Sequence, residues 1–205
     1  MRCFSRALGV ATVFLAVAAP LSAHAAPPRV VNVSAPGVNC VFNPTCTGVV
    51  TDSVGNFALP GDGGAGRLQS RTFAGADNAP AVGKTGYIYR LDMTPMTAPA
   101  GSARCLAALT LDFGPIAQLH YEGSAGPLDD VYVVTGGGIG SIGIASADQS
   151  GAAITFTFSS PVCPGQTSYF FGLASSGLPG PTTTPLIPST SGAPLLVAGR
   201  SPTQR

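Results

Sequence analysis

Charged side chains are scarce in this chain. Asp, Glu, Lys and Arg make up 9% of its 205 residues, against roughly 25% in ordinary globular proteins. Lysine and glutamate occur once each, as Lys84 and Glu122. After residue 25, eight basic residues stand against nine acidic ones, so the net charge is near −1. The sequence has no basic stripe to neutralise a phosphate backbone, which argues against nucleic acid as a partner.

Tryptophan is absent, and the residues that favour helices are few. Exposed helix positions draw on Glu, Lys, Gln and Arg. This sequence instead holds 27 glycines and 19 prolines and is rich in Thr, Val and Ser. Such a composition predicts an all-β protein. The bias toward Ala, Gly and Pro also suggests a bacterial source with a GC-rich genome.

The first 25 residues have the features of a secretory signal peptide. Two arginines form a basic start, an apolar run follows over 7–21, and residues 23–25 are of the kind that signal peptidase recognises. We therefore expect cleavage before Ala26 and a secreted or periplasmic protein. No later apolar stretch approaches the roughly 20 residues that span a bilayer, so no transmembrane anchor is expected.

Short runs of alternating apolar and polar residues, separated by Gly and Pro, indicate β-strands. In the clearest run, Tyr87, Tyr89 and Leu91 share one face. The predicted strands span 29–34, 38–42, 48–59, 67–73, 87–93, 105–113, 130–135, 139–145, 153–159 and 168–174. Nine or ten short strands predict an antiparallel β-sandwich over residues 26–176.

Residues 177–205 are dominated by Pro, Thr, Ser and Gly. A segment with so few core-forming side chains buries too little apolar surface to offset its ordering entropy. The sequence therefore predicts a disordered tail after residue 176.

Four cysteines remain after the predicted cleavage: Cys40, Cys46, Cys105 and Cys163. They allow three disulfide pairings. We favour Cys40–Cys46, which brackets an Asn-Pro turn, and Cys105–Cys163, which joins two predicted strands. A metal or redox site is the alternative, but the chain has no C-x-x-C motif and keeps a single histidine, His120. The sequence thus predicts a disulfide-stapled sandwich in an oxidising compartment.

Two motifs lack the context that their chemistry needs. The glycines of 138–143 match G-x-G-x-x-G, but no amphipathic helix and no acidic residue follow at the required distance, so a glycine-rich hairpin or bulge is favoured over a dinucleotide site. His120 has no G-x-S-x-G nucleophile elbow to serve. We predict no catalytic residue from these motifs.

Acidic residues flank the loop 123–128, namely Glu122, Asp129 and Asp130. Solvated loop acids are the favoured interpretation. A Ca²⁺ site is one alternative, because calcium takes carboxylate oxygens. An extracellular hydrolase that uses Glu122 with Asp129 or Asp130 is the other, because glycoside hydrolysis needs a facing carboxylate pair.

Tyr87, Tyr89 and Tyr132 are the candidate aromatic platforms. Sugar-binding sandwiches stack sugar rings on exposed tyrosine or tryptophan faces. These tyrosines would serve a carbohydrate- or cell-surface-binding module if they were exposed. Tyr87 and Tyr89 share a face with apolar residues, so core packing is favoured.

The stretch 161–175, PVCPGQTSYFFGLAS, resembles the closing strand of uncharacterised secreted bacterial proteins, including some of the PEP-CTERM exported class. The chain lacks the Pro-Glu-Pro motif, apolar helix and basic end of that class's sorting tail. The resemblance implies a secreted β-rich domain and transfers no catalytic residue. The leading hypothesis is a secreted, non-enzymatic structural or binding domain without a cofactor. Its candidate partner is an extracellular glycan or protein.

Overall fold

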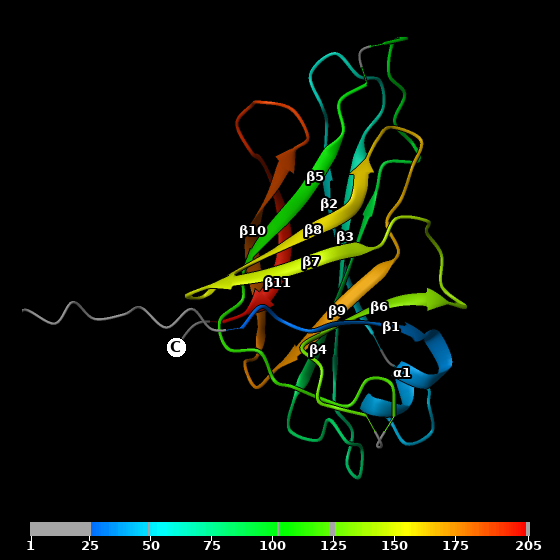
Figure 1. Ribbon diagram of the computed structural model, residues 1–205, viewed down its shortest axis with the longest axis vertical. Helices are drawn as coiled ribbons and strands as arrows, with labels where there is room; N and C mark the ends of the chain where they lie inside the picture. Colours follow the sequence, from blue (N-terminus) through cyan, green and yellow to red (C-terminus); the bar gives the residue numbers. More distant parts are fainter. Residues whose placement is uncertain (1–25, 49, 102, 124–125, 204–205) are drawn as a thin grey trace, which may run out of the picture.

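The computed structural model describes residues 26–48, 50–101, 103–123 and 126–203. These residues form two β-sheets that pack face to face, with one short helix outside them (Figure 1). The all-β sandwich that composition and alternation predict is thereby confirmed. The predicted signal peptide, residues 1–25, lies outside the described residues.

The larger sheet has six strands and the smaller sheet five. In pairing order, the larger sheet consists of β1 (Val30–Ser34), β6 (Val131–Gly136), β9 (Phe170–Ser175), β4 (Thr85–Asp92), β3 (Gly66–Ala74) and β2 (Thr51–Phe57). The smaller sheet consists of β11 (Leu195–Pro202), β10 (Pro179–Pro188), β5 (Leu106–Asp112), β8 (Ala153–Val162) and β7 (Ile144–Ser150). Neighbouring strands run antiparallel, except that β1 and β6 are parallel.

The main core lies between the two sheets, because each strand turns alternate side chains inward. Tyr87 and Tyr89 of β4 are fully buried there beside Phe171 of β9. Their hydroxyls donate hydrogen bonds to the carbonyl oxygens of Gly177 (2.9 Å) and Arg200 (2.6 Å), so neither polar tip is left without a partner. Both rings are core residues, and neither offers a face on which a sugar could stack.

A second, smaller core lies on the outer face of the six-stranded sheet, beneath helix α1 (Ala35–Phe42). The prediction of a strand over 38–42 is wrong. A proline in the first turn favours helix initiation, and Val38, Val41 and Phe42 recur at helical spacing and are buried. Within the described residues, no helix has the length and hydropathy that a bilayer crossing requires.

The predicted disordered tail is also wrong over its described part. Residues 179–188 and 195–202 form the antiparallel hairpin β10–β11, and β10 pairs with β5. Leu186 is buried in the main core together with Val197. Few apolar side chains suffice here because the neighbouring strands satisfy the backbone hydrogen bonds of this segment.

The strand predicted over 139–145 is displaced. Residues up to Gly143 form a loop, and β7 begins at Ile144 and continues to Ser150. Most of β7 is exposed and polar because it is the edge strand of the smaller sheet, so it carries little of the alternation that reveals a half-buried strand. A strand follows the glycine motif, and no helix does.

Both favoured disulfide pairings are confirmed. Cys40 is bonded to Cys46, and Cys105 is bonded to Cys163. The second bond joins the residue before β5 to the residue after β8, next to the pair formed by Leu106 and Val162. It therefore ties two neighbouring strands of the smaller sheet together at one end.

Candidate functional site

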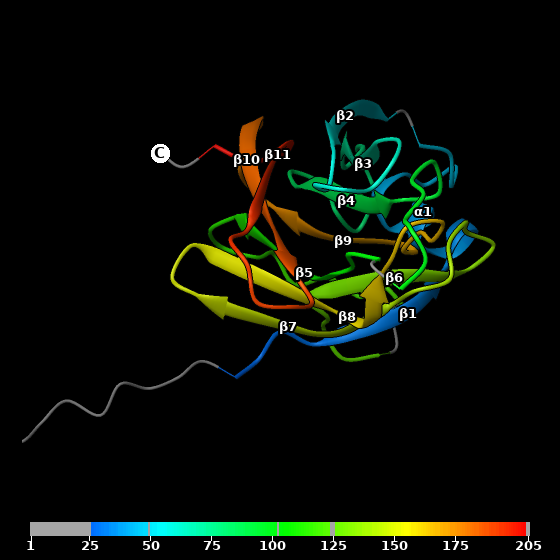
Figure 2. The same ribbon diagram turned by 90° about the horizontal axis from the view of Figure 1, so that it is seen from above.

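Helix α1 covers only part of the outer face of the six-stranded sheet. It lies next to β1 and β6, and Figure 2 shows it on the side of this sheet away from β5 and β10. Beyond the helix, the outer faces of β4, β3 and β2 carry charged and polar side chains. The candidate site lies at the edge of the part of this sheet face that α1 covers.

A groove of about 350 Å³ lies at this boundary, and we call it the helix groove. Its floor includes Phe73 of β3, Ile88 of β4 and Phe170 of β9. Val38 and Asn39 of α1 form the facing wall. Its volume is within the range of small-molecule sites, which are lined by apolar groups with a few polar ones.

Two apolar side chains at the rim of the helix groove are exposed. Val50, which precedes β2, retains 42% of its accessible surface, and Ile139, in the loop after β6, retains 56%. Single exposed apolar residues need no explanation. Two of them on the rim of one apolar groove enlarge the surface that a ligand could cover.

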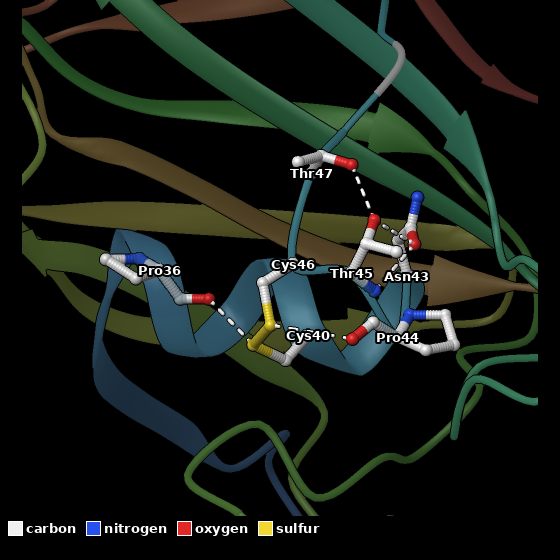
Figure 3. Close-up of a disulfide and its surroundings, with 7 residues drawn as sticks. All are labelled: Pro36, Cys40, Asn43, Pro44, Thr45, Cys46 and Thr47. Carbon is white, nitrogen blue, oxygen red and sulfur yellow. Dashed lines mark hydrogen bonds between the residues drawn. A yellow bond between two sulfur atoms is a disulfide. The ribbon is translucent and has the colours of Figure 1, made fainter.

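A neighbouring cavity of about 410 Å³ shares Asn39, Val50 and Phe73 with the helix groove. Its lining includes Asn43, inside the loop that the Cys40–Cys46 disulfide closes, and Thr47, which follows Cys46 (Figure 3). The Asn43 side-chain oxygen accepts hydrogen bonds from the backbone and hydroxyl of the intervening threonine, at 3.0 and 2.9 Å. The disulfide and this turn hold the segment that leaves α1 against the groove.

Positive charge stands beside the groove. The guanidinium carbons of Arg71 and Arg90 lie 4.8 and 5.1 Å from the ring centre of Phe170, within the range of cation–π attraction. Arg71 also lines the groove. Burial lowers the pKa of Arg90, the nearby Asp92 carboxylate opposes this, and the positive charge of Arg71 lowers it further.

Two carboxylates partly balance these cations, one half-exposed (Asp52) and one buried (Asp92). Arg71 donates from Nε to Oδ1 of Asp52 at 2.6 Å. Arg90 and Arg67 both approach Oδ2 of Asp92, at 3.5 and 3.2 Å. Three arginines and two aspartates leave this face with a surplus of one positive charge.

Tyr132 lines the helix groove but is fully buried. Its hydroxyl lies over Gly172, where a β-carbon would come within 2.7 Å of it. Among the described residues, this hydroxyl has no hydrogen-bond partner. Burial raises its pKa, so Tyr132 stays protonated and can donate. Because its ring is packed beside Tyr121, with centres 4.6 Å apart, it cannot act as an exposed sugar platform.

The predicted acidic cluster surrounds an arginine. Arg29 Nε lies 2.9 Å from Oδ1 of Asp129, and its Nη2 lies 3.7 Å from Glu122. The backbone N–H of Arg29 donates to Asp130 at 2.8 Å. Arg29 thus occupies the position where a calcium ion or a facing carboxylate pair would need open space. In the parts of the chain that the structure describes, no group of three metal-ligating residues could hold a metal ion.

His120 belongs to this same region and has a structural contact. Its Nδ1 lies 3.2 Å from the carbonyl oxygen of Pro127. Among the described residues, no hydrogen bond joins His120 to a serine.

Substituting Asp129 is expected to change how stability depends on pH. Burial raises the pKa of Asp129, and the neighbouring Arg29 partly opposes this. The folded chain therefore holds this proton more tightly than the unfolded chain, in which the pKa is about 3.9. The resulting stability is present below that value and is lost as the pH rises through the folded pKa.

In Asp129→Asn, we expect this loss to disappear, so that the free energy of unfolding declines less as the pH rises above about 4. Urea unfolding of both proteins between about pH 3 and 7 measures the difference. Asp130→Asn leaves Asp129 in place and is the matched control. Identical pH profiles for Asp129→Asn and the parent protein would contradict the assignment.

The residues of the helix groove are not among those that the sequence analysis selected, apart from Tyr132. Arg71 and Ile88 pair across β3 and β4 on the outer face, and each alone resembles an ordinary surface residue of a sandwich. No protein-family model, curated protein or solved structure matches this chain. Function is therefore inferred from the geometry of the site.

Proposed function

We propose that this chain is a secreted, non-enzymatic binding domain and that the helix groove is its binding site. The apolar groove, with exposed Val50 and Ile139 on its rim, carries this proposal. Phe73 and Ile88 of its floor stay partly exposed, although α1 buries the adjoining part of the same sheet face. An apolar hollow of this size beside convergent polar groups is the usual form of a ligand site.

Two further observations support the proposal. Both disulfides suit an oxidising compartment outside the cytosol, which agrees with the signal peptide that the sequence predicts. The acidic residues that could have served hydrolysis are tied to Arg29. The tyrosines that could have stacked on sugars are buried. Binding in the groove is thus favoured over both alternatives.

A charge placed on the groove rim is expected to weaken binding of a neutral apolar probe. In the double variant Val50→Asp/Ile139→Asp, two exposed apolar contacts become carboxylates, so the fold is retained while the apolar rim is lost. We expect the affinity for N-phenyl-1-naphthylamine to fall at least about tenfold, because each buried CH₂ contributes ~0.8 kcal/mol. A fluorescence titration measures this change.

Val54→Asp is the matched control for this experiment. Val54 is 50% exposed and lies on β2 of the same sheet, outside the groove lining. It should leave the probe affinity unchanged. Equal affinities for the double variant and the control would show that the probe binds elsewhere, and the proposed site would then be wrong.

A further inference from the structure

We infer that the ligand of the helix groove is a small apolar carboxylate, with its carboxylate on Arg71 and its body on the apolar floor. This inference rests on the proposed function and specifies its ligand class. Four observations support it: the charge of the groove, the unused donors of Arg71, the second guanidinium beside it, and the apolar floor with its buried hydroxyl.

The charge of the groove has one source. Among the described residues that line it, Arg71 is the charged one. The other lining side chains are apolar or neutral, and Asn39 is a polar one among them. A ligand that fits this lining has an apolar body and a single anionic group.

Arg71 retains donors for such a group. Asp52 accepts from its Nε, and in the described structure no residue accepts from its two Nη atoms. An arginine whose Nε is occupied still presents its terminal N–H groups, which match the two oxygens of a carboxylate. Asp52 is itself a half-exposed surface residue that does not line the groove, so it balances part of the charge of Arg71 without closing the groove.

The second guanidinium strengthens the preference for an anion. Arg90 lies over the same Phe170 ring as Arg71. Two like charges this close repel each other. Their acidic partners are the half-exposed Asp52 and the buried Asp92, and neither lines the groove. A ligand carboxylate at the groove mouth would reduce the repulsion between the two guanidiniums.

The floor accounts for the apolar body. Phe73 and Ile88 provide a partly exposed apolar surface, and α1 adds Val38 from the facing wall. The buried Phe170 ring lies beside them, against the two guanidiniums. Beneath this floor, the unpartnered hydroxyl of Tyr132 provides a buried donor. The groove is therefore suited to a short alkyl or aryl chain that ends in a carboxylate.

Titration calorimetry with octanoate and octan-1-ol tests this inference on the whole secreted domain. We expect octanoate to bind more tightly than octan-1-ol. Arg71→Gln should weaken octanoate at least about tenfold, which corresponds to one charge-assisted bidentate contact, and should leave octan-1-ol unchanged. Arg67→Gln removes another arginine of the same sheet face that lies outside the groove lining, and it should change neither affinity.

Asp52→Asn provides a test that a purely structural role for Arg71 would not pass. It removes the carboxylate that competes for Arg71, so we expect tighter octanoate binding and no change for octan-1-ol. A gain in affinity is not an effect that misfolding could cause.

The possible results distinguish an error in the ligand class from an error in the location of the binding site. Equal binding of the two probes, with no effect of Arg71→Gln, would contradict the inference that the ligand is a carboxylate. The groove would remain the proposed binding site. Failure of the parent protein to bind octanoate would also overturn the carboxylate. Octanoate binding that survives unchanged in Val50→Asp/Ile139→Asp would place the ligand elsewhere and overturn the proposed function as well.

Discussion

Deleting residues 178–205 is expected to abolish cooperative folding. The deletion removes β10 and β11 and leaves β5 without its partner on one side. It also uncovers part of the main core, where Leu186 and Val197 are buried, and removes the carbonyl that accepts the Tyr89 hydroxyl hydrogen bond. We expect a loss of more than about 5 kcal/mol, which is the whole stability of many domains. Near-ultraviolet circular dichroism and thermal melting measure it.

Two leucines of the same hairpin make this test quantitative. Leu186 of β10 is fully buried, whereas Leu196 of β11 is 63% exposed. Leu186→Ala is expected to cost about 2–5 kcal/mol, and Leu196→Ala less than about 0.5 kcal/mol. A shortened chain that melts at the temperature of the full one, or equal effects of the two leucine variants, would mean that the hairpin is not part of the folded core.

The β10–β11 hairpin also shows which strands the sequence pattern does not predict. β4 was predictable because Tyr87, Tyr89 and Leu91 recur at every second position, with charged residues between and after the last two. β10 is built largely from Thr and Pro and buries few apolar side chains, so its order depends on β5 and β11 rather than on its own composition. No local pattern distinguishes such a strand from an unstructured tail.

The prediction of a strand in place of α1 fails for a different reason. Val38, Cys40 and Phe42 alternate along the chain, so a short segment fits a period of two. The same segment fits a period of 3.6 once Val41 is known to be buried. Over eight residues the two periods cannot be separated by pattern, and the outer sheet face beneath the helix decides between them.

The candidate site was less predictable than the fold, because its residues come together from distant parts of the sequence. Arg71 and Phe170 are ninety-nine positions apart, yet they form one cation–π contact. Gly172 of β9 has no side chain, and the end of the Tyr132 ring occupies the position that a β-carbon would need. Likewise, the backbone N–H of Arg29 reaches Asp130 across 101 positions, and its guanidinium pairs with Asp129 and Glu122. Such pairings depend on strand order, which alternation alone does not reveal.

Removing the Cys105–Cys163 disulfide is expected to have the second large effect. The bond closes a loop with a sequence separation of 58, against 6 for Cys40–Cys46. In the chain-entropy account, the longer loop stabilises by about 4 kcal/mol and the shorter by about 2 kcal/mol, because a longer loop restricts the unfolded chain more. Cys105→Ser/Cys163→Ser should therefore lose about 4 kcal/mol in urea unfolding.

The positions of the two disulfides in the fold support the same ranking of their contributions to stability. Cys105–Cys163 ties β5 to β8 at the point where their pairing is irregular, between Leu106 and Ala108. The bond therefore supports a weak part of the smaller sheet. Cys40–Cys46 instead fixes a turn at the end of α1, beside the helix groove. Cys40→Ser/Cys46→Ser is the matched control, with an expected loss of about 2 kcal/mol. Equal losses, or a larger loss in the control, would mean that native-state contacts around each bond, and not loop length, set its contribution.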